Sequence, residues 1–274
     1  MKKKRRLKKL NLLIFILGVL CAIGLSIATI NIIKWKLDSN KTKDELNDIQ
    51  NIAEVKEKKD DENVEIIEQE EIPSSNPYWD YIKMNLIDVN FNELKNINSS
   101  TVGWIQVNGT NINYPFVQTN DNKYYLTHTF DKSYNSAGWV FLDYRNHKDK
   151  IDKNNIIYAH GRYDKTMFGS LKNILSSGWL NNINNYIVKI STETENTLWQ
   201  VFSVYRIPNT NDYIQVDFTS NQEFKDWAMM LMNRSSHNFN TTISENDKVL
   251  TLSTCYNDDE KVVLHAKLIK KETK

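Results

Sequence analysis

A long run without charge near the N-terminus is the feature that most constrains this chain. No Asp, Glu, Lys or Arg occurs from Leu10 to Ile33. A helix needs about 20 apolar residues, each adding about 1.5 Å, to cross the hydrocarbon core of a bilayer. The run is long enough to do this, so residues 10–33 are predicted to form a transmembrane anchor.

The flanking charges predict the orientation of this anchor. Residues 1–9 are mostly Lys and Arg, whereas only Lys34 and Lys36 follow the run closely. Basic residues favour the cytoplasmic side of a membrane, so we expect a cytoplasmic tail at residues 1–9 and an extracellular domain. A cleaved signal peptide is the alternative, but its apolar region spans only about 7–15 residues.

The segment after the anchor has a composition typical of a stalk. Residues 34–75 are rich in Lys, Glu, Asp and Asn, and residues 56–61 are nearly all charged. Such a segment buries too little apolar surface to offset the entropy lost on ordering. We predict a disordered or solvated helical linker there. Pro73 and Pro77 mark its end, and the folded domain is expected at residues 76–274.

The folded domain reads as mainly β. Asn108-Gly109 lies between two β-type runs, and this pair favours a hairpin turn in which both residues take positive φ. The runs do not alternate regularly with helices, so about eight strands predict a closed or nearly closed barrel. The predicted strands are Val102–Val107, Asn111–Val117, Gly138–Tyr144, Asn155–Ala159, Tyr186–Ile190, Leu198–Ile207, Val249–Thr254 and Lys261–Ile269.

Helices are predicted at two places in the domain. Ser220 and Glu223 have the spacing of a capping box, and apolar residues then recur at helical spacing from Phe224 to Leu231. This inserted helix should pack on the barrel. Helical turns are also expected around residues 79–84 and 91–94, at the N-terminal edge of the domain.

One cysteine is a candidate nucleophile. Cys21 lies inside the apolar run, so a disulfide with Cys255 is excluded in practice. Cys255 ends a strand and is followed by a polar loop, which places its thiol at a barrel rim and favours reactivity. His160 also ends a strand, before Gly161.

Other classes of function have little support in the sequence. A net charge of +1 provides no electrostatic argument for binding nucleic acid. No pair of histidines has metal-ligand spacing, and with one usable thiol a zinc site is not expected. The sequence calls for neither a metal nor a cofactor.

Several motifs together resemble the sortase family, class B. Residues 251–255 (TLSTC) are similar to the sortase nucleophile signature. Residues 158–161 (YAHG) and 167–171 (MFGSL) resemble the region of the catalytic histidine in class B, and residues 138–146 (GWVFLDYRN) also resemble that class. The resemblance covers residues 76–270, and several motifs in the same order make it specific.

The resemblance implies an eight-stranded barrel and a cysteine transpeptidase. Sortases cleave a C-terminal sorting signal after Thr, hold the acyl group as a thioester, and pass it to an amine of the cell wall. The implied partners are therefore secreted proteins with a sorting signal, a peptidoglycan amine and the cell membrane. Both a cross-bridge glycine and a diaminopimelate side chain remain open as the amine. Cys255 would be the nucleophile and His160 the proton-transfer group.

This chain departs from the family at the third catalytic position. The family has an Arg on the strand after the cysteine, where this sequence has Lys261. A Lys supplies charge without the planar fork of Arg. We expect Lys261 to take the role, while Arg162 or Arg206 could reach the site instead, or the enzyme could be weakly active.

The resemblance also implies a set of groove residues that contact the sorting signal. These are Asn122, Leu126, Tyr213, Ile214 and Ser253. For each of them, ordinary packing at the barrel rim is the alternative interpretation. Two alternative functions stay open: a weakly active or inactive surface-binding module that keeps the barrel, and a cell-wall cysteine peptidase. Such peptidases usually place the cysteine at a helix start, whereas Cys255 follows a strand.

Overall fold

The computed structural model describes residues 2–67 and 72–274, with side chains from residue 9 onward. The chain divides into two units, one ending at Lys41 and one running from Thr42 to Lys274. The side chains of the predicted basic tail before Lys9, and residues 68–71 of the predicted stalk, lie outside the described residues.

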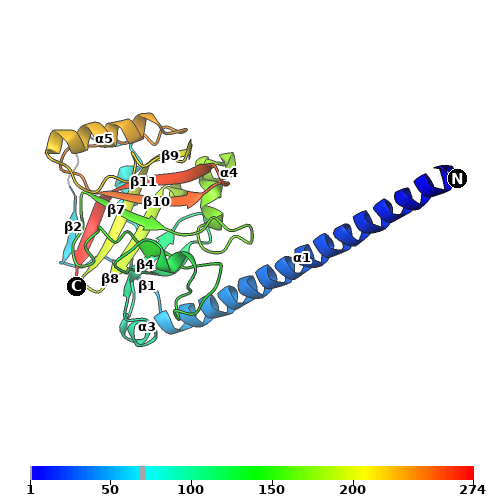
Figure 1. The fold of residues 1–274 in the computed structure, drawn as a ribbon. Helices are drawn as coiled ribbons and strands as arrows, with labels where there is room; N and C mark the ends of the chain where they lie inside the picture. Colours follow the sequence, from blue (N-terminus) through cyan, green and yellow to red (C-terminus); the bar gives the residue numbers. More distant parts are fainter. Residues whose placement is uncertain (1, 68–71) are drawn as a thin grey trace. The chain divides into compact units, whose positions relative to one another are not determined.

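The first helix, α1 (Lys2–Ala53), contains the apolar run (Figure 1). Side chains of the run, such as Leu12, Phe15 and Leu25, are exposed. By length and composition this helix is a candidate membrane span. The last turns of α1 belong to the second unit, where Ile49 and Ala53 are buried in its core.

The second unit is built on a closed barrel of eight strands, as predicted. Neighbouring strands pair in the order β10-β7-β6-β5-β4-β8-β9-β11, and β10 pairs again with β11 to close the ring. The strands are β4 (Thr101–Val107), β5 (Asn113–Val117), β6 (Phe141–Leu142), β7 (Asn154–Tyr158), β8 (Ile187–Thr192), β9 (Glu195–Pro208), β10 (Val249–Cys255) and β11 (Glu260–Thr273).

Large aromatic and branched side chains fill this barrel. Trp104, Trp139 and Trp199 are all buried, on β4, before β6 and on β9. Burial of such side chains stabilises a fold by about 1.5–3 kcal/mol each relative to exposure. The apolar positions that predicted the strands are therefore the ones that form the core.

The hairpin between β4 and β5 is confirmed, but its turn differs from the prediction. The strands are antiparallel, with Trp104 opposite Pro115. Gly109 has φ of +70°, whereas Asn108 is not among the described residues with positive φ. The Val107 amide donates to the Ile112 carbonyl at 3.1 Å, so the connection is longer than a two-residue turn.

The inserted helix is α5 (Asn221–Asn233), which lies beside the barrel near β9 and β11 (Figure 1). The Ser220 hydroxyl accepts from the Glu223 amide, as a capping residue does. Phe224 and Leu231 are buried in a cluster that includes Val263 of β11. The expected helices at the N-terminal edge are α2 (Tyr78–Tyr81) and α3 (Asn92–Ile97). The remaining short helices are η1 (Tyr124–Leu126), η2 (Gly169–Leu175), α4 (Ser177–Leu180) and η3 (Ile183–Asn185).

Part of the range predicted as a stalk is ordered against the barrel unit. β1 (Lys56–Lys58) pairs with β3 (Leu86–Asp88), and β2 (Val64–Ile66) pairs with β11. The fully buried ammonium of Lys270 donates to Asp60 at 2.7 Å. Charges in this segment therefore have partners on the domain, which composition alone does not reveal. The exact boundary between linker and domain remains a prediction.

A buried histidine forms part of a polar chain within the barrel wall. The Tyr205 hydroxyl lies 2.7 Å from His265 Nε2, and Thr251 Oγ1 lies 2.9 Å from His265 Nδ1. The Thr251 hydroxyl donates to Asn154, so it accepts from Nδ1, and Nε2 accepts from Tyr205. Burial, together with the nearby Arg234 charge, lowers the pKa of His265 to about 3.

This buried histidine predicts a pH-dependent stability. The unfolded chain protonates His265 near pH 6.5 and the folded chain near pH 3, so acid favours unfolding. The free energy of unfolding in urea should fall as the pH drops from about 6.5 towards 3, and His265→Gln should reduce that slope. Substitution of the exposed His147 is the control. An NMR titration in which the His265 imidazole protonates near pH 6.5 would contradict this.

Candidate active site

Strand pairing brings the two predicted catalytic ends together. β10 and β7 are parallel neighbours, with Ser253 opposite Tyr158. Parallel strands end at the same edge of a sheet. Cys255 is the last residue of β10, and His160 comes two residues after β7, so both lie at one rim of the barrel.

The two strand ends are in direct contact. The Thr254 hydroxyl donates to the Ala159 carbonyl at 2.8 Å. A Cβ placed on Gly161 would lie only 2.1 Å from the Cys255 carbonyl oxygen. Glycine is required here because no side chain fits between the histidine loop and the cysteine.

A groove with a volume of about 610 Å³ opens at this rim. Every residue predicted for the site lines it, from the proposed nucleophile to the five substrate-contacting positions. Cys255 is half-buried and lines the groove. Phe141 and residues 209–211 also line the groove and were not predicted. Phe141 lies within the motif at residues 138–146, whereas residues 209–211 are polar loop residues with no chemical signal in the sequence.

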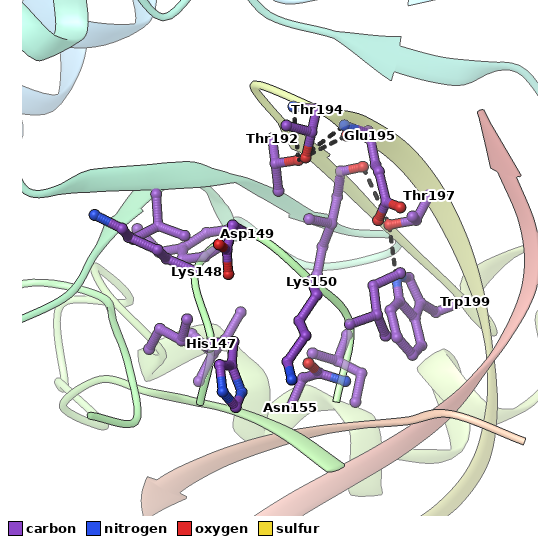
Figure 2. A pocket seen from close by; sticks show the side chains of 17 residues that line it. His147, Lys148, Asp149, Lys150, Asn155, Thr192, Thr194, Glu195, Thr197 and Trp199 are labelled. Carbon is purple, nitrogen blue, oxygen red and sulfur yellow. Dashed lines mark hydrogen bonds between the residues drawn. The ribbon is translucent and has the colours of Figure 1, made fainter. Parts of the chain in front are cut away.

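A second cavity lies at the other end of the barrel strands and has a volume of about 60 Å³. Lys150 lies across its middle, and hydrogen bonds join Thr192 to Thr194 and Glu195 at its edge (Figure 2). No cysteine lines it. The groove beside Cys255 is therefore the better candidate for covalent chemistry.

Lys261 is the cation in contact with the thiol. It lies opposite Cys255 in the antiparallel pair of β10 and β11, and its Nζ is 3.0 Å from Cys255 Sγ. An ammonium at this distance stabilises a thiolate through charge attraction. The same group could stabilise an oxyanion that forms beside the sulfur.

The two alternative arginines are engaged elsewhere. Arg162 is buried, and its guanidinium contacts Asp164 at 3.1 Å. Arg206 pairs with Glu260 and stacks on the Tyr256 ring, 4.0 Å from its centroid. Neither lines the groove. Lys261 therefore fits the cation position better than either of them.

His160 is oriented by the chain at Leu126. Its Nε2 lies 2.8 Å from the Leu126 carbonyl oxygen. A carbonyl only accepts hydrogen bonds, so Nε2 carries the proton and Nδ1 is the basic nitrogen of the neutral ring. Leu126 thus contributes its backbone as well as a side chain at the groove.

Tyr213 and Ser253 form another contact in the groove wall. Tyr213 Oη and Ser253 Oγ are 2.9 Å apart, and both side chains are buried. Burial raises the pKa of Tyr213 above its usual value, with opposing contributions from Ser253 and Lys261. The tyrosine is a neutral hydroxyl at pH 7, and it links the loop after β9 to β10.

Two contacts near the site were missed from the sequence. The Lys172 ammonium donates to the Tyr256 carbonyl at 2.8 Å, just beyond the thiol. Asp143, in the motif at residues 138–146, is buried beneath Asn122 and Tyr158. The clustering of Asp143 with aromatic residues was the available signal. Within residues 2–67 and 72–274, no three His, Cys, Asp or Glu side chains are grouped to hold a metal ion.

Comparisons with known proteins agree with this geometry. Residues 105–269 match the sortase domain. Sortase B of Listeria monocytogenes is 32% identical over 183 residues, covering 65% of this chain and 74% of that protein. Sortase B of Staphylococcus aureus is 32% identical over 184 residues, covering 66% of this chain and 75% of that protein.

Solved structures extend the similarity to three dimensions. Sortase B from Bacillus anthracis in complex with AAEK1 has a TM-score of 0.68 and 31% identity, covering 85% of this chain and 99% of that chain. The Staphylococcus aureus sortase B-substrate complex has a TM-score of 0.61 and 32% identity, covering 66% and 84%. This chain therefore belongs to the sortase family of transpeptidases, and its relatives in sequence and structure include sortases B.

Proposed function

We propose that this chain is a membrane-anchored transpeptidase that cleaves C-terminal sorting signals after Thr and joins the released protein to a peptidoglycan amine. The observation that carries the proposal is the grouping of Cys255, Lys261 and His160 at one groove. In this proposal the anchor keeps the N-terminus in the cytoplasm and the catalytic domain outside the cell.

The first half of the reaction forms a thioester. The Cys255 thiolate attacks the carbonyl carbon of Thr, and Lys261 stabilises the negative oxygen of the tetrahedral intermediate. The C–N bond then breaks, and protonated His160 gives its proton to the leaving amine. The groove residues Asn122, Tyr213 and Ile214 hold the signal upstream of the cleaved bond.

The second half transfers the acyl group. An amine of peptidoglycan attacks the thioester, and neutral His160 accepts its proton through Nδ1. The Cys255 thiolate leaves and is stabilised again by Lys261. The product is a new amide bond, and the enzyme returns to its initial protonation state.

The proposal is tested with the full chain in detergent micelles. Fluorogenic peptides ending in Asn-Pro-x-Thr or Pro-Pro-x-Thr before a cleavable residue are offered with triglycine or diaminopimelate. We expect cleavage with amide exchange, a thioester adduct on Cys255 by mass spectrometry, and no turnover by Cys255→Ala. Hydrolysis of peptidoglycan stems instead would indicate a peptidase. Tight peptide binding without turnover would indicate a binding module.

The proposed role of Lys261 predicts different losses of activity for two substitutions at this position. Lys261→Ala should lower kcat/KM for the peptide by about 10²-fold, the loss typical of removing one oxyanion donor. Lys261→Arg should retain most activity because it keeps the charge beside the sulfur. Both are measured by steady-state cleavage. Full activity of Lys261→Ala would remove this residue from the mechanism.

The contact at Gly161 predicts a steric effect on catalysis. A methyl group there would collide with the Cys255 carbonyl and displace the cysteine from the histidine loop. Gly161→Ala should lower kcat/KM by about 10²-fold, because small misplacements of reacting groups cost that much. Gly178→Ala is the matched control, since nothing lies within 4 Å of the added Cβ. Equal activity of the two variants would contradict the prediction.

A further inference from the structure

A buried carboxylate lies behind the proposed donor-binding wall. Asp143 follows β6, and its side chain has no exposed surface. Arg145 holds it through two side-chain contacts, Nε to Oδ1 at 2.9 Å and a terminal nitrogen to Oδ2 at 2.7 Å. The Arg145 backbone amide adds a third hydrogen bond, also at 2.9 Å.

Asp143 remains ionised in this setting. Burial by itself raises the pKa of a carboxyl, but the hydrogen bonds and charge of Arg145 outweigh it and lower the pKa of Asp143. Burial and the Asp143 charge raise the pKa of Tyr158, so its hydroxyl stays protonated and donates to Asp143 at 3.0 Å. The carboxylate is therefore both charged and fully hydrogen-bonded.

This ion pair connects three separate walls of the groove. Asn122 Nδ2 donates to Asp143 at 3.0 Å, and Tyr158 donates from β7. The Arg145 guanidinium also donates to the Ile214 carbonyl at 3.0 Å, on the loop between β9 and α5. Asn122, Tyr158 and Ile214 line the groove, whereas Asp143 and Arg145 do not.

The orientation of the Asn122 amide is set by the same contacts. Its Nδ2 donates to Asp143, and its Oδ1 accepts from the Tyr144 backbone amide at 3.0 Å. A side-chain amide has two N–H groups and two acceptor lone pairs, so one of each is used. The amide plane is therefore held in place before any peptide enters.

We propose that Asp143 and Arg145 are positioning residues that determine recognition of the donor peptide. The inference rests on the proposed function. Through Asn122 and the Ile214 carbonyl they hold the groove in the shape that accepts the residues upstream of Thr. No hydrogen bond joins either residue to Cys255, His160 or Lys261 in the described part of the chain. Their loss should therefore weaken peptide binding and leave the thiol reactive.

Arginine is suited to this position by its geometry. Its planar fork binds a carboxylate through two nitrogens and still has N–H groups for the Ile214 carbonyl. A lysine would supply a single point donor and could not hold both groups in the same geometry. Arg145→Lys therefore separates the loss of geometry from the loss of charge.

The test measures peptide cleavage by the full chain in micelles for Arg145→Lys and Arg145→Gln. We expect KM for the preferred sorting peptide to rise about tenfold in both, as misplaced binding groups weaken a contact, with kcat near that of the wild type. The ratio between kcat/KM for the preferred peptide and kcat/KM for peptides altered upstream of Thr should decrease. The rate of Cys255 alkylation by iodoacetamide should not change. Arg145 is partly exposed, so Arg145→Lys should fold, and its melting temperature is recorded.

The matched control is Arg234→Gln. It removes another Arg–Asp pair, in which Arg234 donates to both carboxylate oxygens of Asp212, at 3.1 and 2.7 Å. Asp212 lies on the same loop as Ile214. That pair touches neither Asn122 nor the Ile214 carbonyl, so KM should stay near the wild-type value. An equal rise in KM for Arg234→Gln would assign the effect to general loosening of the loop and overturn the inference.

Other outcomes would also overturn it. Unchanged KM in both Arg145 variants would show that the ion pair does not shape recognition. Slower Cys255 alkylation with unchanged KM would place its effect on the thiol instead. Absence of turnover by the wild type would remove the proposed function and this inference with it. Wild-type turnover with unaltered Arg145 variants would remove the inference alone.

Discussion

The parallel pairing of β10 with β7 is the constraint on which the rest of the site depends. These strands are almost a hundred residues apart in the chain, yet their ends meet at one rim because they run in the same direction. The hydrogen bond from Thr254 to Ala159 and the tight contact at Gly161 then fix how closely the ends approach. A one-residue slip would turn Cys255 from the groove towards the opposite face of the sheet.

Strand β11, the antiparallel partner of β10, places the Lys261 ammonium through its register with β10. In the β10–β11 register Lys261 lies directly opposite Cys255, so its ammonium reaches the sulfur without a long loop. This register explains why a short connection between the two strands is sufficient. Arg162 and Arg206, both near the site along the chain or sheet, are paired with carboxylates instead.

Much of the fold could be predicted because the barrel strands carry apolar side chains that must be buried. β1 and β2 could not be predicted this way. Their residues are largely charged, and they are ordered by partners such as Lys270 and Glu272 on β11, which are distant in sequence. The turn at Asn108-Gly109 was assigned the wrong geometry because the Ile112 contact lengthens the connection. The secondary-structure propensity of a local segment does not indicate these tertiary contacts.

The predicted site residues all line one groove. Asp143 was not assigned to the site, although it lies among aromatic residues in the motif at residues 138–146, because the motif alone does not show that its side chain is buried beside the groove. Lys261 and Arg145 also differ in the groups that they contact. Beside the sulfur, Lys261 provides a single point charge. Behind the groove, a carboxylate and a carbonyl must be held together, and Arg145 has the forked donors for this. The groups proposed for thiol chemistry therefore lie at the ends of β7, β10 and β11, whereas the ion pair proposed to shape donor recognition lies in the segment after β6.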